Sequence, residues 1–167
     1  HRMKHGYIPC ETMNESVAYD LEYALADGAL ANAAALMASY ASSGQVKESY
    51  EADHEHFTAR SRSYRHLFDP ETGFIRGKYS SGEFRENYSP FSSNHRGDDY
   101  CEGNGWQYTW LVPHDVHGLI SLFGGDEPFL TQLDALFEAD SALNEGASID
   151  ITGMIGQYAH GNEPSHH

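Results

Sequence analysis

Residues 14–40 carry the pattern that settles the predicted architecture, NESVAYDLEYALADGALANAAALMASY. Apolar side chains recur in it at the spacing of one helix face, namely at Val17, Leu21, Ala24, Leu25, Leu36, Met37 and Tyr40. This spacing predicts one long helix. The small alanine and glycine residues between them would let another helix approach closely.

A second helix is predicted for residues 46–67, directly after the first. It would bury the aromatic residues Tyr50, Phe57, Tyr64 and Phe68, and leave Arg60, Arg62 and Arg65 in solvent. The sequence Asp69-Pro70-Glu71-Thr72-Gly73 ends it, because proline disfavours helical backbone at the residue before it and glycine accepts a positive φ. The two helices should therefore form a pair, and the second of them should end in this turn.

The remaining chain alternates a long loop with short helices. Residues 74–105 are rich in Gly, Pro and Asn and predict a loop, with one short strand near residues 74–76. Helical periodicity returns at residues 115–123, closed by two glycines, and at residues 129–137, opened by Asp126 as N-cap.

A last helix is predicted for residues 149–158, with Gly153 and Gly156 at close contacts. Together these segments predict an all-α fold of helix pairs joined by long loops, the pattern of helical barrels or solenoids.

The composition excludes several classes of protein. The 167 residues hold 10 Lys and Arg against 25 Asp and Glu, a formal net charge of -15, which argues against binding to nucleic acid or to an anionic membrane surface. At 40% hydrophobic and 13% aromatic residues the chain is too apolar for a disordered acidic tail. No apolar stretch reaches the roughly 20 residues of a membrane span.

Cys10 and Cys101 could form one disulfide or remain free thiols.

Glu102 is the first candidate for catalysis. It stands between Cys101 and a Gly-Asn-Gly turn, just before an aromatic run that contains Trp106 and Trp110. Desolvation against aromatic side chains favours a protonated carboxyl group, the form that a general acid uses. The alternative is an exposed loop glutamate. The two tryptophans could stack on a sugar ring, or belong to the core.

Two segments offer metal-ligating residue types. His114-Asp115-Val116-His117 has imidazoles that suit zinc, but it also fits a helix start in which Asp115 is the cap and His117 packs. Asn162 and Glu163 offer oxygen atoms that suit calcium, which takes about six to eight of them. Two donors alone do not define a site.

The motifs of the whole chain, in order, resemble those of glycoside hydrolase family 92. They are Gly6-Tyr7-Ile8-Pro9-Cys10, Met13-Asn14-Glu15-Ser16, Asp69-Pro70-x-Thr72-Gly73-Phe74, Tyr100-x-Glu102-Gly103-Asn104-x-Trp106-Gln107-Tyr108, Val112-Pro113-His114-Asp115, Gly124-Gly125-Asp126 and Gly156-Gln157-Tyr158-x-His160-Gly161-Asn162-Glu163-Pro164-Ser165-His166-His167. This family consists of exo-acting α-mannosidases. The two longest runs are specific enough to favour a function for Glu102, Asn162 and Glu163.

The resemblance implies an inverting, calcium-dependent hydrolysis of α-mannosides in an (α/α)6 barrel that follows a β-sandwich domain. It implies that Glu102 is the general acid, and that Asn162 and Glu163 lie in the calcium-binding region. Contacts with the mannose-containing glycan are implied for Trp106, Gln107, His160, His166 and His167. Members of the family are commonly secreted or periplasmic, which sets the expected location.

The resemblance also implies that the chain is part of a larger catalytic domain. The family's base aspartate belongs to a later motif that these 167 residues do not contain, so we expect the isolated segment to be inactive or nearly so. The chain starts with His1 and ends with His167 in mid-pattern, which agrees with this expectation; a tag remnant is the alternative for the last two histidines. A non-catalytic helical module that binds carbohydrate or metal is the alternative function.

Overall fold

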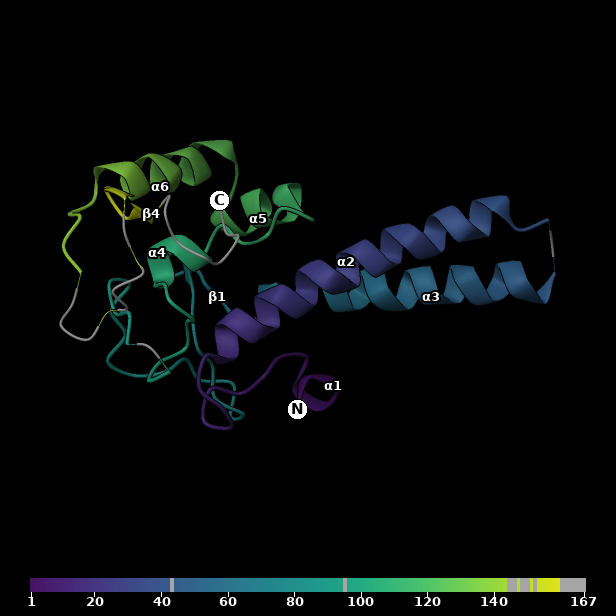
Figure 1. Ribbon diagram of the computed structural model, residues 1–167, viewed down its shortest axis with the longest axis horizontal. Coiled ribbons are helices and arrows are strands. Elements are labelled where there is room, and N and C mark those ends of the chain that lie inside the picture. The colour runs from purple at the N-terminus through teal and green to yellow at the C-terminus, as the bar shows by residue number, and fades with distance from the viewer. Residues whose placement is uncertain (43, 95, 144–146, 148–150, 152, 160–167) are drawn as a thin grey trace.

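The computed structural model describes residues 1–42, 44–94, 96–143, 147, 151 and 153–159. Its longest elements are α2 (Ser16–Tyr40) and α3 (Gln45–Ser61), which lie side by side and project from the remaining fold (Figure 1). Small residues line the buried face of α2 toward its far end, among them Ala31, Ala34 and Ala38. The first predicted helix is confirmed nearly to the residue.

The second predicted helix is confirmed over a shorter range. After α3 the chain continues as a 3-10 helix, η1 (Ser63–His66), and enters a hairpin of β1 (Phe68–Asp69) and β2 (Phe74–Ile75). The turn has the predicted mechanism: the N–H of Gly73, at φ 73°, donates to the Asp69 carbonyl at 2.9 Å, and a carboxylate oxygen of Asp69 accepts from the N–H of Glu71 at 3.0 Å. The short strand predicted near residues 74–76 is confirmed.

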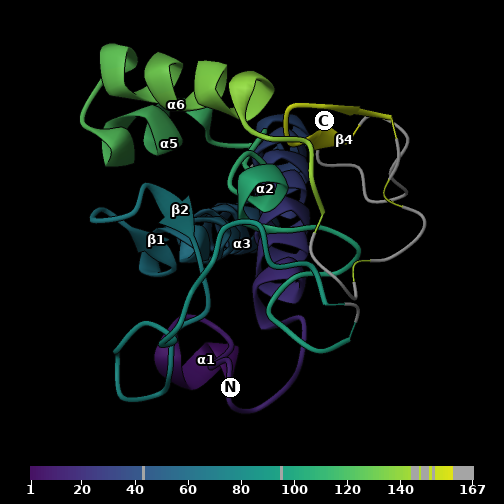
Figure 2. The ribbon, with the colours of Figure 1, turned by 90° about the vertical axis from the view of Figure 1, so that its left-hand side faces the viewer.

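The described residues form four further α-helices: α1 (Arg2–His5), α4 (Gly105–Tyr108), α5 (Val116–Phe123) and α6 (Asp126–Glu138). The predicted α5 and α6 are confirmed and lie side by side (Figure 2). The rings of Phe123 and Phe129 meet edge to face across them, with centroids 5.7 Å apart. The residue before α6 is Gly125, so Asp126 lies in the first turn instead of capping it.

The helix predicted for residues 149–158 is wrong in its described part. Met154–Ile155 (β3) pairs antiparallel with Tyr158–Ala159 (β4), and Gly156 and Gln157 form the two-residue turn. Gly156 has a φ of 59°, and a Cβ there would lie 2.4 Å from the Leu136 carbonyl oxygen. The glycine therefore serves a turn packed against the end of α6, and the fold is mostly helical with short strands instead of purely α.

The core lies where the start of α2 meets β1, β2 and α4. Its largest fully buried side chains include Tyr64, Tyr108, Leu21, Leu67 and Ile75. Both cysteines are free thiols, so the structure has Cys10 buried and Cys101 half-buried without a disulfide. Within the described ranges, no helix has the length and apolar character that crossing a membrane requires.

Candidate active site

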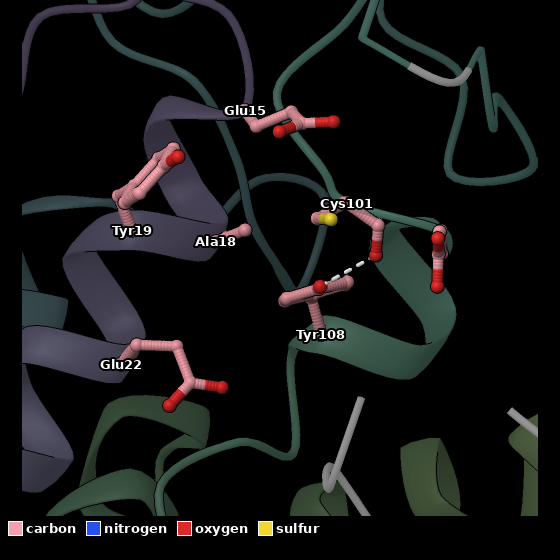
Figure 3. Close-up of a pocket in the computed structure, with 7 residues that line it drawn as sticks. Glu15, Ala18, Tyr19, Glu22, Cys101 and Tyr108 are labelled. Atoms are coloured by element: carbon pink, nitrogen blue, oxygen red, sulfur yellow. Dashed lines mark hydrogen bonds between the residues drawn. The ribbon is translucent and has the colours of Figure 1, made fainter. Parts of the chain in front are cut away.

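A cavity of about 370 Å³ lies between the start of α2 and the loop that leads into α4 (Figure 3). Glu102 is one of the residues that line it. The cavity is lined by Glu15, Ala18, Tyr19 and Glu22 on one side and by Cys101, Glu102 and Tyr108 on the other. Glu102 is half-buried and has a left-handed backbone with φ 48°. Such a conformation in a residue other than glycine is sparsely populated, and it gathers at functional sites.

The backbone around Glu102 is held by the short helix that follows it. The Tyr108 hydroxyl donates to the Cys101 carbonyl at 2.6 Å, as the dashed line in Figure 3 shows. Gly103 leaves room for this arrangement, because a Cβ there would lie 2.7 Å from the Tyr108 ring. Asn104 caps α4 in a capping box with Gln107. Residues 101–104, which we call the acid loop because Glu102 is the predicted general acid, are thus fixed at both of their ends.

The two walls of the cavity are joined by hydrogen bonds between distant parts of the chain. The N–H of Glu15 donates to the Asp98 carbonyl at 2.7 Å, and the N–H of Val17 donates to the Asp99 carbonyl at 3.0 Å. These carbonyls satisfy the free N–H groups at the start of α2, which has no side-chain cap. The Asp99 carboxylate is in turn held by both Nε and Nη2 of Arg85 at 2.9 Å.

The cavity is negatively charged. Glu15, Glu22 and Glu102 line it, and none of the described residues that line it is a lysine or an arginine. Burial, and then the charges of Glu15 and Glu102, raise the pKa of the Cys101 thiol to about 11, so this thiol stays protonated at neutral pH. Such a surface favours neutral or cationic groups over anions.

The segment His114–His117 forms a helix start. Asp115 caps α5 by accepting from the N–H of Gly118 at 3.0 Å, and it also accepts from the Tyr64 hydroxyl at 2.7 Å. Burial opposes its ionisation, but the hydrogen bonds from Tyr64 and Arg65 outweigh burial and lower the pKa of Asp115. His114 Nε2 lies 2.9 Å from the Ser61 carbonyl oxygen. Asp115 therefore caps the helix as that alternative predicts, but the packing position predicted for His117 is wrong, because this side chain is exposed.

The family model of the glycosyl hydrolase family 92 catalytic domain matches residues 1–167. The chain belongs to glycosyl hydrolase family 92.

Solved structures of family 92 mannosidases from Bacteroides thetaiotaomicron match almost the whole chain. One α-mannosidase, in complex with mannoimidazole, is 38% identical with a TM-score of 0.80, and the match covers 95% of this chain and 20% of that one. A second structure of that enzyme is 37% identical with a TM-score of 0.74, covering 95% and 18%. An inverting mannosidase from strain VPI-5482 is 31% identical with a TM-score of 0.68, covering 97% and 21%.

This chain therefore spans about a fifth of the length of these family 92 structures. No curated protein matches it.

Two residues that the family resemblance assigns to the substrate do not line the cavity with Glu102. Trp106 packs between aromatic rings, with centroids 4.9 Å from Phe74 and 5.8 Å from Phe91. Gln107 is 2% exposed and uses both ends of its amide within the chain. Trp110 stacks on Phe123 with a centroid distance of 5.9 Å, so for this tryptophan the core alternative holds.

The other residues assigned by the family resemblance lie outside the described residues: His160, Asn162, Glu163, His166 and His167. Within the part of the chain that the structure describes, no group of three or more His, Cys, Asp or Glu side chains is arranged to hold a metal ion.

Sequence reasoning missed one wall of the cavity, made by Glu15, Tyr19 and Glu22. The signal was present in part, because Glu15, Tyr19 and Glu22 are spaced four and three residues apart and so share one face of a helix. Nothing local indicated that residues 98–102 return to that face, since the bond from Glu15 to Asp98 joins residues far apart in the sequence.

Proposed function

We propose that this chain is part of an inverting α-mannosidase, in which Glu102 protonates the departing oxygen when terminal α-linked mannose is released from a glycan. The observation that carries the proposal is the position of Glu102. It lines a cavity with two further carboxyl groups, its backbone has a left-handed conformation, and it lies in one of the two longest runs that resemble the family. A relative in complex with mannoimidazole supports mannose as the sugar.

The proposed chemistry uses two carboxyl groups on opposite sides of the sugar. Glu102 gives its proton to the glycosidic oxygen, while a base removes a proton from the attacking water. In inverting glycosidases the two groups stand about 6.5–9.5 Å apart, which leaves room for that water. We place the base in an aspartate motif that follows residue 167 in the longer protein. Glu15 and Glu22 would add negative charge beside the oxocarbenium-like sugar.

The remaining family assignments stay proposals. Asn162 and Glu163 would contribute oxygen ligands to a calcium ion, which supplies a positive charge that binds and orients sugar hydroxyls. His160, His166 and His167 would contact the glycan. The described contacts of Trp106 and Gln107 favour an indirect role, in which both side chains support the backbone of the acid loop by packing and hydrogen bonding. A secreted or periplasmic location, and N-glycans as substrates, rest on the family alone.

We also propose that the chain contributes helix pairs to an (α/α)6 barrel. Two pairs support this, α2 with α3 and α5 with α6 (Figures 1 and 2). The exposed face of α2 supports it too. It carries large apolar side chains at a spacing that suits contact with a further helix, namely Tyr23, Leu30, Met37 and Tyr40. Other helices of the same catalytic domain would cover them.

The reaction can be tested with the full-length protein that carries this chain. Proton NMR of a freshly started digest of an α-mannoside should show β-mannose first, followed by slow mutarotation to the α anomer. Glu102→Gln should lower turnover of a mannose disaccharide by about 10²- to 10⁴-fold, whereas Glu86→Gln, an exposed glutamate outside the cavity, should leave it unchanged. Release of α-mannose first would refute inversion, and full activity of Glu102→Gln would refute its role as the acid.

A further inference from the structure

Three buried amide side chains meet directly behind the acid loop. Asn104 and Gln157 are 0% exposed and Gln107 is 2% exposed. A buried amide loses free energy wherever a donor or acceptor is left unpaired. Each of these three satisfies both ends of its amide.

Their hydrogen bonds form a closed ring. Asn104 Nδ2 donates to Gln157 Oε1 at 2.8 Å, and Gln107 Nε2 donates to the Gln157 carbonyl oxygen at 3.0 Å. Asn104 and Gln107 complete the ring through the capping box, with bonds of 3.3 and 3.1 Å between each side chain and the other's N–H. The ring therefore joins the start of α4 to the turn of the β3–β4 hairpin.

Gln157 extends the ring to the end of α6. Its Nε2 donates to the Asp140 carbonyl at 2.5 Å, and its N–H donates to the Leu136 carbonyl at 2.8 Å. One residue thus holds three segments that are distant in sequence: the acid loop, the end of α6 and the hairpin. In the sequence, the hairpin leads after residue 159 directly into the run from His160 to Glu163.

The ring acts on Glu102 through the backbone. Asn104 follows the acid by two residues, and Glu102 has a left-handed φ of 48° that surrounding contacts must maintain. The Tyr108 bond to the Cys101 carbonyl fixes the residue before Glu102, and the ring fixes the residue after Gly103. Loss of the ring would release one of these two anchors.

We infer that Gln157 is a positioning residue for catalysis: through Asn104 it holds the carboxyl group of Glu102 at a fixed place relative to the β3–β4 hairpin. This rests on the proposed function of Glu102. Catalysis by a general acid depends on the placement of its carboxyl group, and an error of about 1 Å can lower the rate about 100-fold.

The decisive variant is Asn104→Asp in the full-length protein. The introduced carboxylate keeps the oxygen that caps α4, since Asp and Asn are comparable caps, but it has no amide hydrogen for Gln157 Oε1. We expect kcat for a poor leaving group, such as methyl α-mannoside, to fall about 10- to 100-fold, with a much smaller loss for 2,4-dinitrophenyl α-mannoside and little change in KM. Asn32→Asp, an exposed Asn-to-Asp change on α2, is the matched control.

A second variant, Gln157→Leu, removes every side-chain bond of the residue. If it folds, it should show the same selective loss for poor leaving groups. A merely structural role predicts another result, a lower melting temperature for Asn104→Asp with an unchanged ratio of the two rates, and this result would overturn the inference.

Glu102→Gln separates this failure from failure of the proposed function. If Glu102→Gln loses activity selectively on poor leaving groups and folded Asn104→Asp does not, only the positioning role is wrong. If Glu102→Gln itself shows no selectivity, the assignment of the acid is wrong, and the positioning role falls with it.

Discussion

The two ends of α2 belong to one continuous helix but differ in their surroundings. At the near end, Val17 and Leu21 are 0% exposed and contribute to the core beside the cavity. At the far end, Leu36 is 56% and Tyr40 is 77% exposed, and the helix contacts α3 chiefly through alanines. The pattern of apolar residues is similar at both ends, so the difference teaches that periodicity specifies a helix and not what covers it.

The largest expected effect of this difference appears when leucine is replaced by alanine at each end of α2. Leu21→Ala should lower the free energy of unfolding by about 2–5 kcal/mol, because it leaves a cavity in the core. Leu36→Ala should change it by less than about 0.5 kcal/mol in this chain, because that side chain is already exposed. Urea denaturation of the two variants makes the comparison. Equal losses would mean that the ends of α2 do not differ as described.

A second pair of substitutions compares an ion pair near the cavity with an ion pair on the exposed surface of α3. Arg85→Met should lower the free energy of unfolding by about 1–3 kcal/mol, because it leaves the buried Asp99 carboxylate without its bidentate partner. Lys47→Met breaks an exposed pair with Glu51 on α3, 3.8 Å apart, and should cost at most about 0.5 kcal/mol. High salt should weaken only the second pair noticeably. A cost for Lys47→Met as large as that for Arg85→Met would contradict this account.

The near end of α2 should also respond to pH through Asp20. Burial raises the pKa of Asp20 to about 6, although the N–H of Ile8 and the side chain of Arg2 act in the opposite direction. The folded state therefore takes up this proton before the unfolded state does, and Asp20 favours folding below pH ~4 but loses that contribution as the pH rises through 6.

Compared with Asp20→Asn, the wild-type chain should accordingly gain about 1–2 kcal/mol of relative stability between pH 7.5 and pH 4.5. Denaturation midpoints of both proteins at the two pH values measure this. Asp53→Asn, on the exposed surface of α3, is the control in the other region. A relative stability that falls with acidification would contradict the raised pKa.

The smallest effect concerns the field inside the cavity. The pKa of the Cys101 thiol is raised to about 11, first by burial and then by Glu15 and Glu102. In a Cys10→Ser background, Glu102→Gln should speed alkylation of Cys101 at pH 8 by about 2- to 3-fold, because removing one nearby charge makes the thiolate easier to form. Glu86→Gln should leave the rate unchanged. An unchanged rate in Glu102→Gln would mean that this carboxylate does not act on the thiol.

The local features of the fold were predictable from the sequence. The helices α2, α5 and α6 follow from apolar periodicity, and the Asp69–Gly73 turn follows from proline and glycine backbone preferences. The β3–β4 hairpin was not predictable in this way. A glycine such as Gly156 is compatible with a close contact in a helix as well as in a turn. The contact that favours the turn is with the Leu136 carbonyl, which lies in another part of the chain.

The site, too, was predictable only where its residues belong to a local motif. Glu102 stands out because of a local motif. Its partners across the cavity, Glu15 and Tyr19, depend on backbone bonds from α2 to Asp98 and Asp99 that no local pattern encodes. The same holds for Gln157, whose side chain reaches Asn104 across more than fifty positions of sequence.

The most direct test of the account is the dependence of the Glu102→Gln variant on the leaving group, measured in the full-length protein. A general acid matters most when the departing oxygen is a poor leaving group. The account predicts that kcat/KM falls about 10²- to 10⁴-fold on a mannose disaccharide and no more than about 10-fold on 2,4-dinitrophenyl α-mannoside. Equal losses on the two substrates in a folded variant would contradict the assignment of Glu102 as the acid.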